Sequence, residues 1–213
     1  MFKGVIFDMD GTVVDSERLY FQIASGILSE HGYSLSREVF IATCGVSREE
    51  GGKIYSQSFP ALDGERDVMD VLDARYAQAL MEGRLKRKAG CLSLLDRLKD
   101  RGIPTAVASS NTPEAVERTL SAAGLAGRFD AVIHAGLVRR VKPYPDLLYR
   151  AAEEIGVLPE ECLVLEDSEP GILAAKAAGM AVILIPDMYP VTETMARLSL
   201  RVVSTLEEVE KFL

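Results

Sequence analysis

Short apolar runs that alternate with helix-like segments constrain the fold of this 213-residue chain more than any other feature. The runs are short and almost entirely apolar, which is typical of strands that are buried on both faces of a sheet. Their alternation with helices predicts an α/β fold, with a parallel sheet and helices on both faces. Ligands of such folds bind at the edge where the strands end. The predicted strands are Val5–Phe7, Thr105–Ala108, Ala131–Ile133, Leu163–Leu165, Val182–Ile185 and Arg201–Val203.

Helical patterns fill the spaces between these strands. Thr112 followed by Pro113, for example, is a typical cap with proline at the first helical position. The alternation breaks over residues 15–88, where helical patterns continue and no convincing strand occurs. We therefore expect a core made of residues 1–14 and 89–213, and a small helical domain, residues 15–88, inserted after the first strand.

The charge of the chain narrows the choice of partner. The formal net charge is −8, and such a surface repels nucleic acid and anionic membranes, although a local site can still attract a small anionic metabolite. The basic cluster at residues 84–88 is interpreted as a solvated linker, with attraction of an anionic substrate as the alternative. A cytoplasmic location is expected, since aspartates come too early for a signal peptide and the three cysteines are widely spaced. We expect a monomer, with a weak dimer as the alternative.

Two carboxylates, Asp8 and Asp10, directly follow the first predicted strand. Acidic residues two positions apart at a strand end can both face the ligand edge, and Gly11 permits a sharp turn and a close approach of the backbone to a ligand. A polar turn is the alternative interpretation, because this pattern also occurs in loops. A calcium loop is excluded, since the positions that must hold glycine and glutamate are Val13 and Leu19.

A second acidic pair, Glu166 and Asp167, follows another predicted strand. Alone, it could be the acidic start of a helix, where the helix dipole favours carboxylates. If both strands end at the same edge, however, four carboxylates converge there and repel one another unless a divalent cation lies between them. Oxygen ligands select a hard cation, so Mg²⁺ is the expected cofactor. The predicted metal residues are Asp8, Asp10, Glu166 and Asp167.

Two further polar segments complete the predicted site. Ser109, Ser110 and Asn111 lie between a strand and a helix, where hydroxyl groups and free amides form an anion site, although simple helix capping is the alternative. Lys142 could direct an ammonium group into the same cleft, unless it is an ordinary exposed lysine. The predicted phosphate-binding residues are Gly11, Thr12, Ser109, Ser110, Asn111 and Lys142.

In this order, the segments DMDGT, ASSN, VKPYPD and LEDSEPGI resemble the motifs of the haloacid dehalogenase-like hydrolase superfamily. The resemblance covers nearly the whole chain, and the helical insertion is similar to that of the subgroup with β-phosphoglucomutase and phosphoglycolate phosphatase. It implies a Rossmann-like α/β core with a helical cap. It also implies a magnesium-dependent phosphatase that acts on a small phosphorylated metabolite, with a sugar phosphate as the favoured class.

The resemblance also implies roles for the matching residues. Asp8 is the nucleophile that forms an aspartyl-phosphate, and Asp10 is the general acid and then the general base. Ser109 and Lys142 hold the transferring phosphoryl group. The implied magnesium ligands are Asp8, the backbone carbonyl of Asp10, and Asp167, with Glu166 in or beside that shell.

The inserted domain is expected to select the substrate, through Tyr20 and Arg48. Arg48 lies in a segment that resembles the cap loop of β-phosphoglucomutase and could bind a second phosphate or a sugar hydroxyl; a surface arginine is the alternative. The mutase subgroup has a histidine and a lysine where this chain has Tyr20 and Cys44, which favours a phosphatase over a phosphomutase. A receiver-like signalling module is a further alternative, but such modules are usually shorter and lack a helical insertion.

Overall fold

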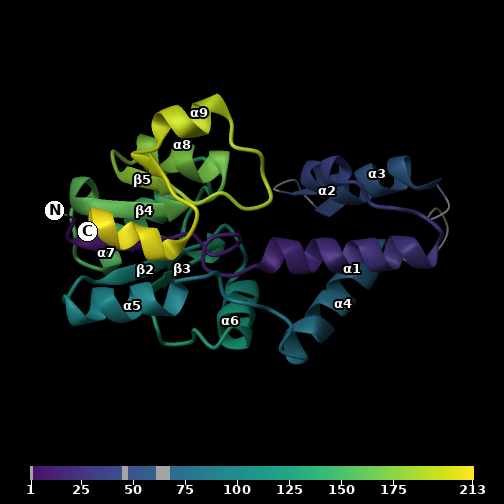
Figure 1. Cartoon of the computed structure of the whole chain (residues 1–213), viewed down its shortest axis with the longest axis horizontal. Helices are drawn as coiled ribbons and strands as arrows, with labels where there is room; N and C mark the ends of the chain where they lie inside the picture. The colour runs from purple at the N-terminus through teal and green to yellow at the C-terminus, as the bar shows by residue number, and fades with distance from the viewer. Residues whose placement is uncertain (1, 45–47, 61–67) are drawn as a thin grey trace. The chain divides into compact units, whose positions relative to one another are not determined.

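The computed structural model describes residues 2–44, 48–60 and 68–213. Its contacts divide the chain into two compact units, one formed by Met1–Asp15 with Lys86–Leu213 and the other by Ser16–Leu85. Figure 1 shows the chain coloured from its N-terminus to its C-terminus. The first unit, called the core below, contains the sheet, and the second, called the insert, is built from helices.

The core contains one sheet, with the strands β1 Gly4–Phe7, β2 Thr105–Ala108, β3 Ala131–Ile133, β4 Cys162–Glu166, β5 Ala181–Leu184 and β6 Arg201–Val202. All of them pair in parallel, in the order β3-β2-β1-β4-β5-β6. β1 is central, and its Phe7 is in register with Val107 of β2 and with Leu165 of β4. The predicted parallel sheet is confirmed, and the residues that follow β1, β2 and β4 emerge at one edge.

The helices of the core are α5 Cys91–Asp100, α6 Pro113–Ala122, α7 Asp146–Glu154, α8 Glu169–Ala177 and α9 Glu193–Leu198, with the 3-10 turns η2 Ala135–Leu137, η3 Pro159–Glu161 and η4 Leu206–Phe212. Along the chain, α5 precedes β2 and α6 connects β2 to β3, so the sheet grows from β1 toward β3. The connections through α7, from β3 to β4, and through α8, from β4 to β5, lead to the other side of β1 (Figure 1). Because crossovers between parallel strands are right-handed, these two sets of helices cover opposite faces. On the α7 and α8 face, Ile6 and Val164 of the strands share one buried cluster with Leu147 and Ile172 of the helices.

Capping side chains start two of these helices at the ligand edge. The Thr112 hydroxyl accepts a hydrogen bond from the Ala115 N–H at 3.4 Å, and Pro113 occupies the first turn, so the predicted cap of α6 is confirmed. The Ser168 hydroxyl likewise accepts from the Gly171 N–H at 3.3 Å and starts α8. Both helices therefore begin within a few residues of a strand end, and the turn between each strand and its helix carries polar side chains.

The insert contains the helices α1 Ser16–Glu30, α2 Arg37–Thr43, α3 Arg48–Ser58 and α4 Val68–Met81. Aromatic contacts join three of them, because the ring of Tyr20 on α1 lies 6.4 Å from that of Phe40 and 5.5 Å from that of Tyr76. An ion pair at 2.6 Å between Arg75 and Glu30 also links α4 to α1. The predicted helical insertion after the first strand is confirmed. None of the helices described here combines the length and the apolar character needed to cross a bilayer.

Candidate active site at the carboxyl edge of the sheet

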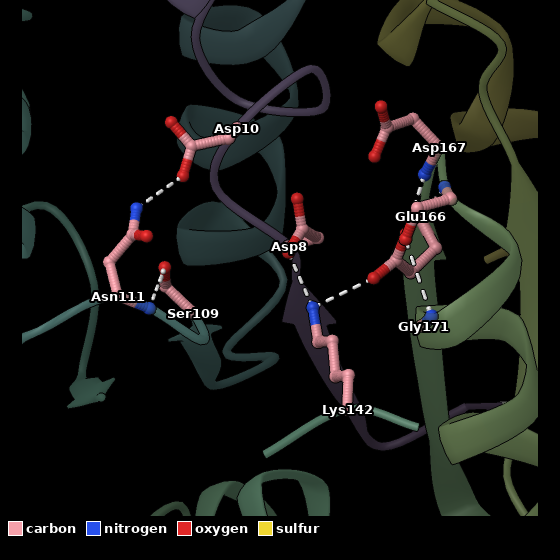
Figure 2. A network of polar contacts seen from close by, with 9 residues as sticks. Asp8, Asp10, Ser109, Asn111, Lys142, Glu166, Asp167 and Gly171 are labelled. Carbon is pink, nitrogen blue, oxygen red and sulfur yellow. Dashed lines mark hydrogen bonds and ion pairs between the residues drawn. The ribbon is translucent and has the colours of Figure 1, made fainter. Parts of the chain in front are cut away.

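Polar segments from β1, β2 and β4 meet at the carboxyl edge of the sheet. The Asp8 N–H donates to the Leu165 carbonyl at 2.9 Å, and the Ser109 N–H donates to the Ile133 carbonyl at 2.9 Å. These bonds extend the parallel ladder by one residue beyond the strands. They hold Asp8 next to Glu166, and Figure 2 shows how the side chains of the site lie.

The segment before α7 brings an ammonium group to the same edge. Lys142 Nζ donates to Asp8 Oδ1 and to Glu166 Oε1, the second at 2.7 Å (Figure 2). Only 6% of the Lys142 side chain is exposed. A lysine enclosed by two carboxylates is not the ordinary exposed lysine of the alternative interpretation.

The charges of this site are unbalanced. Burial raises the pKa of Asp8 well above its usual value; Lys142 opposes this shift, while the carboxylates of Glu166 and Asp10 add to it. Burial lowers the pKa of Lys142, but the ion pairs with Asp8 and Glu166 outweigh it and the net shift is upward. The two shifts therefore have different main causes: burial dominates for Asp8, whereas the two neighbouring carboxylates dominate for Lys142.

Glu166 is held from several sides and has no exposed side-chain surface. Its Oε2 accepts hydrogen bonds from the Asp167 N–H at 2.8 Å, the Ser168 N–H at 2.8 Å and the Ser168 hydroxyl at 2.9 Å. Gly171 leaves room for the carboxylate, since a Cβ there would lie 1.6 Å from Oε1. The start of α8 therefore fixes Glu166, and Glu166 in turn fixes Lys142.

Asp167 approaches the turn that follows β1. Gly11 in this turn has a φ of +78°, a left-handed conformation that favours glycine. A Cβ at Gly11 would also lie 2.2 Å from Asp167 Oδ2, so only glycine lets this carboxylate come so close. As a result, one ligand oxygen from each of Asp8, Glu166 and Asp167 lies within 4.8 Å of the others.

The carboxylate of Asp10 has different surroundings from that of Asp8. Asp10 Oδ2 accepts a hydrogen bond from Asn111 Nδ2 at 2.8 Å (Figure 2). The Asn111 N–H donates to the Ser109 hydroxyl at 3.2 Å, and Ser109 is buried. Thr12 is buried too, and its hydroxyl makes no hydrogen bond within the described part of the chain. Ser110 is exposed.

Comparison with known proteins identifies the family to which this chain belongs. A model of the haloacid dehalogenase-like hydrolases matches residues 5–185. The chain belongs to this family. The family predicted from the four sequence motifs is therefore confirmed.

The hydrolase is also similar to individual proteins over most of its length. It is 32% identical over 180 residues to the phosphorylated carbohydrates phosphatase of Thermotoga maritima, a match that covers 84% of the chain and 82% of the relative. It is 32% identical over 181 residues to the fructose-1-phosphate phosphatase YqaB of Escherichia coli, covering 84% of the chain and 94% of the relative. A crystal structure of a family hydrolase from Deinococcus radiodurans, with bound phosphate and sodium, is 30% identical. It superposes with a TM-score of 0.85 over 98% of this chain and 93% of that one.

The acidic group of this hydrolase fits a hard divalent cation. Asp8, Glu166 and Asp167 offer only oxygen ligands, which Mg²⁺ prefers, and Lys142 alone does not neutralise three carboxylates. The Asp10 carboxylate does not belong to this group among the described residues. A ligand role for the Asp10 backbone carbonyl stays a prediction.

The two cap residues predicted to contact substrate lie in the insert. Tyr20 is half-buried on α1, with its ring against those of Phe40 and Tyr76. Arg48 is the first residue of α3; its side chain and residues 45–47, which precede it, lie outside the described part. Substrate contacts by Tyr20 and Arg48 therefore stay predictions.

The structure also reveals a buried ion pair that the sequence analysis missed. Lys88 Nζ donates to Asp187 Oδ1 at 2.7 Å, and only 16% of the Lys88 side chain is exposed. Its neighbour Arg87 donates to the Ala123 carbonyl at 2.6 Å. The interpretation of the basic cluster as a solvated linker is therefore wrong for Lys88, because its ammonium group is largely buried against Asp187. Asp187 follows β5, so the rule that polar residues gather at strand ends could have found it.

Proposed function

We propose that this hydrolase is a phosphatase that releases phosphate from a small phosphorylated sugar through an aspartyl-phosphate on Asp8. One observation carries the proposal: the Asp8 carboxylate lies at the end of the central strand with the Lys142 ammonium against it and the acidic pair of β4 beside it. An ammonium group and a hard cation can together neutralise a phosphoryl group that a carboxylate attacks. The similarity to two sugar phosphatases supports the substrate class.

In the first step, Asp8 Oδ2 forms a bond to phosphorus while the bond from phosphorus to the sugar oxygen breaks. Lys142 already binds Asp8 Oδ1, which leaves the other oxygen to attack. A protonated Asp10 gives its proton to the departing sugar oxygen, so that a neutral hydroxyl leaves. The products of this step are the free sugar and phosphorylated Asp8.

In the second step, the Asp10 carboxylate removes a proton from a water molecule, and the water oxygen attacks phosphorus. The bond between phosphorus and Asp8 breaks, inorganic phosphate leaves, and Asp10 is protonated again for the next cycle. Asn111 orients Asp10 in both steps through its hydrogen bond to Oδ2. The Ser109 hydroxyl and Lys142 hold the phosphoryl oxygens, and Mg²⁺, when bound by Asp8 and Asp167, supplies further neutralisation of charge.

Phosphate release across a panel of substrates tests this proposal. The panel contains fructose 1-phosphate, the two glucose phosphates, phosphoglycolate and nucleoside monophosphates, each with Mg²⁺ and with a chelator. We expect the sugar phosphates to be the best substrates, with turnover that requires the metal. Interconversion of the two glucose phosphates, without net phosphate release, would instead identify a phosphomutase.

Asp8→Asn identifies the nucleophile. We expect this variant to fold normally by thermal unfolding and to lose turnover, because an amide does not attack phosphorus. Asp96→Asn is the matched control: it removes a carboxylate that is ion-paired with Arg128 in the same core and should keep full activity. Normal turnover by a homogeneous Asp8→Asn protein would contradict the assignment of Asp8 as the nucleophile.

A further inference from the structure

Lys88 and Asp187 form an ion pair beside the candidate metal site. They are 99 positions apart in the chain and join at 2.7 Å. The Asp187 side chain has no exposed surface, and Lys88 has little. A buried pair of this kind is weak evidence for stability, because removing two charges from water is costly. This cost raises the question of what else the pair does.

Lys88 is attached to the loop that carries Asp10. Its N–H donates to the Val13 carbonyl at 2.9 Å, and its Nζ lies 4.0 Å from Asp15 Oδ1. The preceding residue, Arg87, pairs with Val14 in a short antiparallel bridge. Backbone hydrogen bonds therefore fix the place from which the ammonium group reaches Asp187.

Asp187 lies close to Asp167, the residue that follows β4. It lies three positions after the last residue of β5, and one of its carboxylate oxygens lies within 4.8 Å of one from Asp167. Two buried carboxylates at this distance repel each other, and a cation near Asp167 would relieve that repulsion. Mg²⁺ also keeps several of its water molecules in proteins, and carboxylates outside the ligand shell accept hydrogen bonds from such waters.

We propose that Asp187 is a positioning residue for the metal site: its negative charge, beside Asp167, helps to hold the cation. Lys88 fixes the position of the Asp187 carboxylate and partly offsets its negative charge. The proposal rests on the metal-dependent phosphatase function proposed above. Asp187 attracts the cation and Lys88 repels it. Removing the Asp187 carboxylate must therefore lower the affinity for Mg²⁺, whereas removing the Lys88 ammonium group must raise it. A pair that only stabilised the fold would not produce this difference in sign.

Titration calorimetry with Mg²⁺ alone, together with the change in Tm that Mg²⁺ causes, tests the proposal on the whole chain without any turnover measurement. Asp187→Asn should weaken Mg²⁺ binding about tenfold, as is common for residues just outside a metal shell, and should shrink the change in Tm. Lys88→Met should lower Tm without metal, because it removes the ammonium group that offsets the buried Asp187 carboxylate, but should bind Mg²⁺ more tightly than the wild type. Asp130→Asn is the control, since that carboxylate accepts from the Thr105 N–H at the amino end of β2 and should leave Mg²⁺ binding unchanged.

The outcomes separate this inference from the proposed function. Mg²⁺ binding by Asp187→Asn that equals that of the wild type, or equal weakening in both single variants, would overturn the positioning role while leaving the phosphatase proposal intact. Absence of Mg²⁺ binding by the wild type would instead contradict the metal-dependent function. If a single variant fails to fold, the double variant K88M/D187N is compared with the single variant that does fold: it should bind Mg²⁺ more tightly than Asp187→Asn, or more weakly than Lys88→Met, and equal affinity refutes the inference.

Discussion

Gly171→Ala is expected to destabilise the core even though alanine is the better helix former. Gly171 lies in α8, where helix propensity alone favours alanine by about 1 kcal/mol. The added Cβ, however, would lie 1.6 Å from Glu166 Oε1 and 1.9 Å from its Cδ. The carboxylate must then leave Lys142 or its backbone donors, and breaking a buried ionic contact costs about 3–5 kcal/mol. The net decrease in the free energy of unfolding is therefore about 2–4 kcal/mol.

Urea unfolding measures this free energy, and phosphate release with Mg²⁺ measures the effect on the site. We expect kcat to fall on the order of 100-fold, because Lys142 loses the acceptor that aims it at the phosphoryl group. Gly26→Ala is the matched control in α1, where no described atom beyond its own stretch of helix lies within 4 Å of the added Cβ, so the variant should gain up to about 1 kcal/mol. The reasoning is refuted if both variants are stabilised and Gly171→Ala keeps its kcat.

Two further predictions concern proton transfer and the buried thiols. Asp10→Asn should slow both half-reactions, which rapid-quench measurement of phosphorylated protein can separate; a variant that slows neither step contradicts the acid and base role. Burial raises the pKa of the Cys91 and Cys162 thiols to about 11, from an ordinary value of 9.0. Because the folded state favours the neutral thiols, their contribution to stability is full below pH 9 and is lost as the pH rises through 11. Iodoacetamide should therefore modify them slowly in the native protein at pH 9 and rapidly after unfolding, whereas equal rates would contradict the shift.

The parallel sheet was predictable because each strand carries its own local signal. Leu163–Leu165 is continuously apolar and is followed at once by acidic residues, so strand and ligand edge are marked by adjacent positions. Once the strands are known to be parallel, the topology alone brings Asp8 and Glu166 to one edge. The Lys88–Asp187 pair has a weaker signal: Asp187 follows β5 closely enough to be a candidate strand-end residue, but its partner is 99 positions away and resembles an ordinary surface charge.

Gly171 shows a second limit of sequence reasoning. Its helical position predicts nothing beyond weak helix propensity, and only the folded structure shows that a carboxylate occupies the space of its missing side chain. Gly11 was easier, because a glycine directly after an acidic pair at a strand end already indicates a tight turn, and its φ of +78° agrees. A glycine that provides space for a neighbour is thus harder to predict than one that provides a backbone conformation.

The alternation of side chains after β1 explains how two nearby carboxylates can perform different chemistry. Met9 points into the core and is fully buried, which turns Asp8 and Asp10 outward at the same edge. Asp8 then meets a buried ammonium group and two acidic neighbours, whereas Asp10 meets the neutral amide of Asn111. A nucleophile needs a cation that keeps it ionised and offsets the charge of the phosphoryl group, while a proton shuttle needs a partner that tolerates both of its protonation states. An amide meets that need, because its N–H₂ can donate to the carboxylate and its oxygen can accept from the acid. The division between nucleophile and acid therefore follows from the partners of each carboxylate rather than from any difference between the two aspartates themselves.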